Sequence, residues 1–93
     1  MRLDLFLKAS RLSPRRTVAQ KLCDAGLVSL NGVRAKSGHP VKAGDEITFR
    51  QRDTTTTLRV VSVPERTQIS RDEAGRLYEV LSKRVDTDPG SEI

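Results

Sequence analysis

Five basic side chains gather at the start of the chain, in a stretch whose single acidic residue is Asp4. They are Arg2, Lys8, Arg11, Arg15 and Arg16. An arginine guanidinium presents a planar fork of donors that fits phosphate oxygens, and clustered cations attract polyanions. Residues 1–52 carry 11 Lys or Arg against four Asp or Glu, whereas residues 53–93 carry six against eight. This asymmetry favours a nucleic acid as the ligand, and a solvated basic face is the alternative interpretation.

Further cations follow in a predicted hairpin and the loop after it, namely Arg34, Lys36 and Lys42. They extend the basic surface in one interpretation and protect exposed sheet edges in the other. The chain has few aromatic residues, and we assign Phe6, Phe49 and Tyr78 to packing. Because proteins that bind single strands usually display aromatic stacking platforms, the sequence favours folded RNA recognised through its backbone.

Catalytic chemistry is not indicated by the titratable residues. The single histidine, His39, lies beside Pro40 in a loop and has no second titrating partner nearby in sequence. The single cysteine, Cys23, falls on the apolar side of a predicted helix, which indicates a buried side chain and excludes an internal disulfide. Asp45 and Glu46 lie where a loop meets a strand, as turn and edge residues do. We therefore expect no enzyme activity, no cofactor and no metal site.

A short helix is predicted over residues 2–9, where apolar residues recur at spacings of three and four. Asp4 precedes Lys8 by four residues, so an ion pair between them is expected on another side of this helix. A helix this short depends on tertiary packing for its stability.

A second helix is predicted to start at Ser13 and Pro14, because serine can accept amide hydrogens and proline suits the first helical position. It should run to about Ala25, and Gly26 can take the left-handed conformation that ends a helix. The two helices then form a hairpin that carries the basic cluster.

The dipeptide Asn31–Gly32, between two short alternating segments, is the strongest β-hairpin signal in the chain. Two more strands are predicted over residues 46–50 and 57–63, linked by a longer and looser hairpin over residues 51–56. The sheet should be small and mainly antiparallel.

The stretch from Ser70 to Glu73 matches a capping box, and the apolar residues after it follow helical spacing as far as Val85. The fold class expected is α+β, with two short helices packed on the sheet and a helix near the C-terminus. The expected organisation is an RNA-binding domain over residues 1–66, a C-terminal helix over residues 67–85 and a disordered acidic tail over residues 86–93.

The N-terminal segment contains no apolar run long enough for a signal peptide or a membrane span, since Asp4 and Lys8 interrupt it. We expect a cytoplasmic protein without a membrane partner.

The order of these elements resembles the αL-type RNA-binding domain first known from the fourth small-subunit ribosomal protein. The resemblance covers residues 1 to about 50 and rests on Arg2-Leu3-Asp4, Arg11, Arg15-Arg16, the run from Gly26 to Gly32, Lys36 and the run from Val41 to Ile47. It implies that the helix pair and the hairpin bind RNA, with matching basic residues at Arg2, Lys8, Arg11, Arg15, Arg16 and Lys36. Arg34 is a candidate from its place on the hairpin alone.

Freestanding copies of this size look like the family of bacterial ribosome-associated quality control factors that stabilise P-site tRNA. The resemblance implies a non-enzymatic factor that binds large-subunit rRNA and P-site tRNA on a stalled large ribosomal subunit, and that supports alanine tailing by a partner protein. We expect a monomer. Two alternatives stay open, a heat-shock-type ribosome-recycling protein and an accessory RNA-binding subunit of an RNA-modifying enzyme. The short acidic end of the chain disfavours the heat-shock type, whose C-terminal extension is longer and basic.

Overall fold

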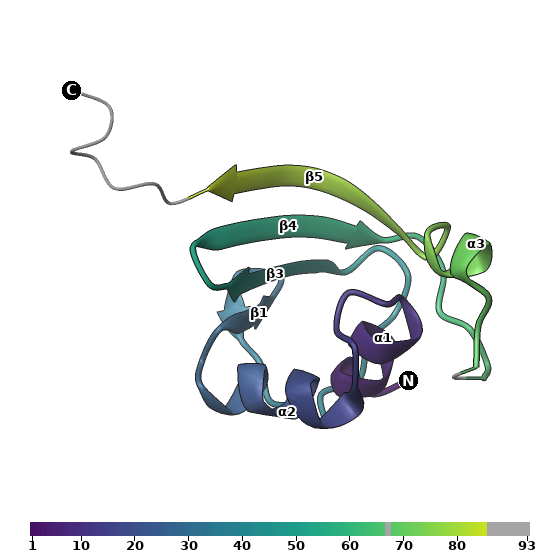
Figure 1. Cartoon of the computed structure of the whole chain (residues 1–93), viewed down its shortest axis with the longest axis horizontal. Helices are drawn as coiled ribbons and strands as arrows, with labels where there is room; N and C mark the ends of the chain where they lie inside the picture. The colour runs from purple at the N-terminus through teal and green to yellow at the C-terminus, as the bar shows by residue number, and fades with distance from the viewer. Residues whose placement is uncertain (67, 86–93) are drawn as a thin grey trace.

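Two helices lie against one face of an antiparallel sheet (Figure 1). The computed structural model describes residues 1–66 and 68–85. Its elements in chain order are α1 (Leu3–Ala9), α2 (Arg16–Asp24), β1 (Val28–Leu30), β2 (Val33–Arg34), β3 (Glu46–Gln51), β4 (Thr54–Val60), α3 (Arg71–Ala74) and β5 (Tyr78–Val85). The strands lie in the order β2-β1-β3-β4-β5, with antiparallel neighbours throughout. The predicted α+β architecture of a helix pair on an antiparallel sheet is confirmed.

The core lies between the helix pair and the sheet. Side chains that are 0% exposed come from both layers, namely Leu3, Phe6, Ala19, Val28, Ile47 and Leu58. Alternation along β3 places Ile47 and Phe49 in this core and leaves Glu46 and Arg50 exposed. Burial of each large apolar side chain stabilises the fold by about 1.5–3 kcal/mol, so the helices are held mainly by this contact.

The second helix starts later than the sequence predicts. It begins at Arg16, and its N-cap residue is Arg15, whose side chain makes no capping hydrogen bond. Ser13 is buried: its amide donates to the Leu7 carbonyl at 3.0 Å, and its hydroxyl donates to the Arg15 carbonyl at 3.1 Å. Because these bonds turn the chain back over the end of α1, the prediction that Ser13 caps the helix is wrong. The predicted end is confirmed, since Gly26 has φ +77°.

The predicted Asn31–Gly32 hairpin is confirmed and connects β1 to β2. Both turn residues have positive φ, 52° for Asn31 and 84° for Gly32. The Asn31 side chain also donates to Asp45 at 3.1 Å and accepts from the Glu46 amide at 2.9 Å. The turn is therefore fastened to the start of β3.

The hairpin between β3 and β4 is tighter than the sequence predicts. Gln51 pairs directly with Thr54, which leaves a two-residue turn in which Arg52 has φ 57°. The long link predicted there is wrong, because the β-branched threonines continue the strand. The strand also ends earlier than predicted, at Val60.

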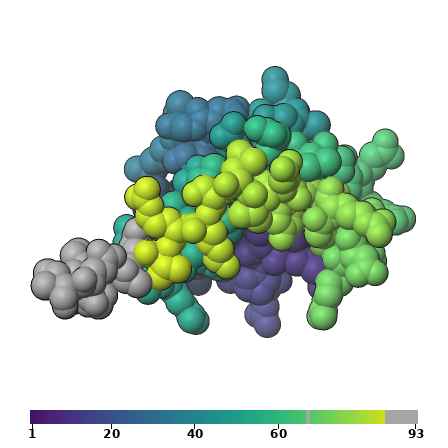
Figure 2. Space-filling model, turned by 90° about the horizontal axis from the view of Figure 1, so that it is seen from above, coloured from purple at the N-terminus to yellow at the C-terminus, as the bar shows by residue number. Residues whose placement is uncertain are grey.

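The predicted C-terminal helix over residues 67–85 is wrong. The Ser70 hydroxyl does accept from the Glu73 amide at 3.1 Å, but α3 is a single turn that ends at Ala74, with Gly75 as its C-cap. The chain then forms β5, which pairs with β4 at the edge of the sheet and lies exposed across the face seen in Figure 2. Pairing satisfies the backbone groups along the edge of β4, which a helix would leave open. The predicted acidic tail, residues 86–93, lies outside the described residues.

Candidate nucleic-acid interface

A buried carboxylate organises two of the arginines near the start of the chain. Asp4 is 0% exposed. Its oxygens accept from Arg2 Nε at 3.2 Å and Nη2 at 3.3 Å, from Arg16 Nε at 3.1 Å and from Gln20 Nε2 at 3.0 Å. The Leu5 amide donates a further bond at 2.8 Å. We name the group of Arg2, Asp4, Arg16 and Gln20 the Asp4 cluster.

The Asp4 cluster favours the ionised form of a carboxylate that burial alone would disfavour. Burial alone would raise the pKa of Asp4, but the hydrogen bonds donated by Gln20, the two arginines and the Leu5 amide outweigh it and hold that pKa below its usual value. The ionised carboxylate in turn holds Arg2 and Arg16 together against their mutual repulsion. Their side chains remain 46% and 43% exposed, so both guanidinium groups are accessible to an outside anion.

The predicted ion pair between Asp4 and Lys8 is wrong. Both residues lie on α1, but the Asp4 carboxylate faces α2, where Arg16 and Gln20 lie four residues apart on one side of the helix. These donors, with Arg2, take up the carboxylate oxygens. Lys8 instead lines a groove on another part of the surface.

The loop after β2 is fastened to the start of α1 beside this cluster. The Asp4 amide donates to the Ser37 carbonyl at 3.1 Å. Gly38 lies close to the Arg2 guanidinium, because a Cβ built on this glycine would be 3.6 Å from Arg2 Nη2. The exposed Lys36 therefore belongs to a loop that packs against the Asp4 cluster.

Arg15 lies at the N-terminus of α2, next to Arg16 of the Asp4 cluster. Its side chain is exposed, and the first turn of α2 receives no side-chain cap. Amide groups at a helix N-terminus carry partial positive charge. Arg15 and Arg16 thus add full charges where the helix already favours an anion.

Arg34 contacts the opposite end of α2. Its Nη2 donates to the Asp24 carbonyl at 3.2 Å, and a Cβ on Gly26 would lie 2.8 Å from its Cζ. A cation at a helix C-terminus is stabilising, and the sequence does not indicate this role for Arg34. Arg34 and Lys36 line one hollow with Cys23, so the structure brings these two candidates together at this end of the helix.

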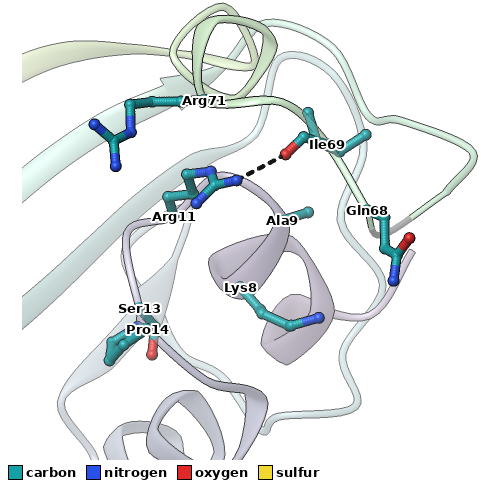
Figure 3. Close-up of a pocket in the computed structure, with 8 residues that line it drawn as sticks. All are labelled: Lys8, Ala9, Arg11, Ser13, Pro14, Gln68, Ile69 and Arg71. Carbon is teal, nitrogen blue, oxygen red and sulfur yellow. Dashed lines mark hydrogen bonds between the residues drawn. The ribbon is translucent and has the colours of Figure 1, made fainter.

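Lys8 and Arg11 line a different surface, a groove of about 960 Å³ between the α1–α2 connection and the segment before α3 (Figure 3). We name it the basic groove, and its polar lining includes Lys8, Arg11, Gln68 and Arg71. Arg11 Nη2 donates to the Ile69 carbonyl at 3.1 Å across it. The candidate cations therefore form three groups, at the Asp4 cluster with Arg15, at the C-terminal end of α2, and in the basic groove.

Sequence reasoning missed Gln20 and Arg71, and it gave Asp4 the wrong partner. Gln20 follows Arg16 by four residues in the predicted second helix, so their shared helix face was a usable signal. Arg71 carries no such signal, because it reaches the groove through packing of segments far apart in sequence.

The described part of the chain offers no arrangement for catalysis at its cysteine or for metal binding. Burial, followed by the nearby Asp4 and Asp24 carboxylates, raises the pKa of the Cys23 thiol to about 11, so it is protonated at neutral pH. Within residues 1–66 and 68–85, no group of three or more His, Cys, Asp and Glu side chains is placed to hold a metal ion. In the same ranges, no helix has the length and apolar character needed to cross a membrane.

The helix pair, the Asn-Gly hairpin and the arginine surface define an S4 domain protein, and the S4 domain family model matches residues 1–47. The chain is 45% identical over 80 residues to the RQC P-site tRNA stabilizing factor of Halalkalibacterium halodurans, covering 86% of this chain and 89% of that protein. The factor of the same name from Bacillus subtilis is 42% identical over 83 residues, covering 89% and 94%. Among solved structures, trimeric heat shock protein 15 of Vibrio cholerae matches with a TM-score of 0.81 and 32% identity, over 88% of this chain and 82% of that one.

The chain therefore belongs to the S4 domain family and, within it, to the RQC P-site tRNA stabilizing factors. Membership confirms the resemblance noted in the sequence. It also confirms the prediction of an RNA-binding factor of ribosome-associated quality control that is not an enzyme.

Proposed function

We propose that the chain binds a large ribosomal subunit that carries stalled peptidyl-tRNA, and that it contacts both large-subunit rRNA and P-site tRNA. The observation that carries the proposal is the Asp4 cluster, in which a buried carboxylate holds two half-exposed arginines in fixed positions. The name of the H. halodurans and B. subtilis relatives, which describes stabilisation of P-site tRNA, supports the choice of ligand.

The binding chemistry in this proposal is recognition of the RNA backbone. Arg16 donates to Asp4 through Nε, and no hydrogen bond joins its terminal nitrogens to the residues that the structure describes. A guanidinium that is already fixed loses little side-chain freedom when it binds a phosphate. The exposed Arg15 adds a further charge, so affinity should fall steeply as salt concentration rises.

The chain acts in this proposal by holding RNA. While it keeps P-site tRNA in place on the stalled subunit, a partner protein adds the alanine tail to the blocked chain. We place this activity in the cytoplasm, with the factor acting as a monomer.

Replacing Arg16 with alanine tests the proposal. We expect binding of the full chain to purified large subunits that carry peptidyl-tRNA to weaken about tenfold, because a charge-assisted contact to phosphate is lost. Cosedimentation at a series of salt concentrations measures the change.

Arg59→Ala is the matched control for Arg16→Ala. Arg59 is an exposed arginine of β4 that lies opposite Glu46 on one neighbouring strand and Glu79 on the other, outside the Asp4 cluster. The proposal fails if Arg16→Ala and Arg59→Ala cosediment as the unchanged chain does.

A recycling factor of the heat-shock type is the second candidate, and the structural match to V. cholerae heat shock protein 15 favours it. Such a factor would move the blocked tRNA without supporting tail addition. Measuring alanine tails on a stalled reporter in a deletion strain separates the two candidates, since loss of tails supports the first and normal tails support the second.

A further inference from the structure

We propose that the basic groove is a second site for the phosphate backbone of folded RNA, and that Arg71 is one of its binding residues. The inference rests on the proposed function, because it assigns a further part of the same RNA ligand to this chain. It adds a site beyond the Asp4 cluster.

Two parts of the chain that are distant in sequence form the walls of the basic groove. One wall is the end of α1 with its connection to α2, and the other is the segment that leads into α3 (Figure 3). Arg11 joins them, because its Nη2 donates to the Ile69 carbonyl at 3.1 Å. Arg11 also has φ 61°, a left-handed conformation that arginine seldom adopts. The Arg11 side chain thus bridges the two walls of the groove.

No ion pair compensates the cations of the basic groove among the residues that the structure describes. Lys8, Arg11 and Arg71 line it, and none of its described lining residues is acidic. Arg11 donates to a neutral carbonyl, and no ion pair joins Lys8 or Arg71 to a residue within 1–66 or 68–85. Glu73 of α3 pairs with Arg66 at 3.8 Å. Like charges gathered at a concave surface raise the local positive potential and attract an anion.

The shape and lining of the basic groove point to a phosphate backbone. At about 960 Å³ the groove can take a stretch of polymer rather than a single small anion. Its described lining contains no aromatic ring on which a base could stack. Two guanidinium groups, an ammonium group and the Gln68 amide are instead donors for phosphate and ribose oxygens.

Continuity with the Asp4 cluster favours RNA over an acidic peptide as the occupant. The groove wall at Arg11 continues through Ser13 into Arg15 and Arg16, so one short connection carries cations from one site to the other. A folded RNA that contacts Arg16 would meet the groove as the next basic surface along the helix pair. Arg71 lies outside residues 1–47, so the RNA interface would extend beyond the matched S4 domain.

Substitution of Arg71 in the full chain tests the inference. We expect Arg71→Ala to weaken binding to purified large subunits that carry peptidyl-tRNA by about two- to fivefold at moderate salt. The slope of log affinity against log salt should become shallower by about one. Arg71→Glu should weaken binding further, because it places a like charge against the phosphate. The Arg71 side chain is exposed, and unfolding temperatures of the variants check that the fold is kept.

Arg76→Ala and Arg76→Glu are the matched controls, since Arg76 is an exposed arginine just after α3 that does not line the groove. We expect both to bind as the unchanged chain does. If the Arg71 and Arg76 variants bind the subunits with equal affinity while Arg16→Ala weakens binding, the inference is wrong and the proposed function stands. If the unchanged chain fails to bind the subunits, the proposed function is wrong and the inference falls with it. Normal subunit binding by Arg71→Glu with loss of a protein partner would assign the groove to an acidic peptide and overturn the RNA assignment.

Discussion

Asp4 contributes a negative charge to a surface that attracts anions, yet its position makes it a support for binding. It is fully buried, and its charge is matched by Arg2 and Arg16 through hydrogen bonds of 3.1–3.3 Å. The arginines project from different helical segments, at the start of α1 and the start of α2. Asp4 therefore sets the spacing between two cations that would otherwise repel each other.

We predict that Asp4→Asn lowers the free energy of unfolding by about 1–3 kcal/mol, because neutral asparagine leaves both arginines without a buried counter-charge. RNA binding should weaken as well, although the change removes a negative charge. Urea unfolding and cosedimentation with large subunits measure the two effects.

Asp53→Asn serves as the control for charge alone, since Asp53 is exposed in the turn between β3 and β4. It should leave stability unchanged and should not weaken binding. Tighter RNA binding by Asp4→Asn would contradict the positioning role and would mean that net charge decides affinity.

At the scale of helices and strands, the sequence predicted those features that depend on neighbouring residues. The Asn31–Gly32 turn and the Ser70 cap follow from local backbone chemistry, and both were predicted correctly. Ser13 was also a valid local cap, but its amide donates to the Leu7 carbonyl of α1 and its hydroxyl donates to the Arg15 carbonyl instead of capping α2. The spacing of the apolar residues after Gly75 is compatible with a helix and with a strand. Pairing with the edge of β4 stabilises the strand. Both errors arise where the chain bonds to another element, α1 for Ser13 and β4 for the residues after Gly75, which the local pattern does not show.

Gly26 ends α2 beneath the Arg34 guanidinium, and this helix end can be tested directly. We predict that Gly26→Ala destabilises the protein by about 1–2 kcal/mol, because φ +77° is strained for an L side chain. The new Cβ would also lie 2.8 Å from Arg34 Cζ and displace it. Thermal unfolding measures the loss.

Gly75→Ala is the matched control, with φ −67° and a nearest atom 3.7 Å from the added Cβ. It should be neutral or stabilising. Equal destabilisation by the two substitutions would rule out backbone strain at Gly26. If Gly26→Ala lowers stability less in the Arg34→Ala variant than in the unchanged chain, the difference comes from contact between the new Cβ and the Arg34 guanidinium.

At the scale of the whole molecule, the candidate site depends on one continuous sheet and core. The matched S4 domain ends near the start of β3, yet β4 and β5 continue the same sheet, and Leu58 and Leu77 join the core. The basic residues of the site could be selected from sequence because their charges are clustered. Their grouping could not, because the Asp4 cluster and the basic groove each combine segments that only the folded chain brings together.

Acid unfolding should report on the Asp4 cluster. Because the pKa of Asp4 is lowered in the folded state, its stabilisation is fully present above the unfolded value of about 3.9 and is lost as pH falls through the folded value. We predict that the difference in unfolding temperature between the unchanged chain and Asp4→Asn is largest near neutral pH and narrows below about pH 4. The unfolding temperatures of both proteins are measured from pH 6 to about pH 3. Because the other carboxylates are common to both proteins, their titration cancels in the difference. A difference that stays constant over this range would show that the Asp4 charge contributes nothing to stability.

The first residues of the chain are built into the fold beside the candidate site. The Met1 carbonyl accepts from the Val41 amide at 2.8 Å, and Arg2 forms a β-bridge with Pro40. Any peptide fused ahead of Met1 therefore emerges next to Arg2. An affinity tag or fluorescent protein attached there would sit over the surface proposed for RNA, and the loss of binding would be mistaken for a property of the protein itself.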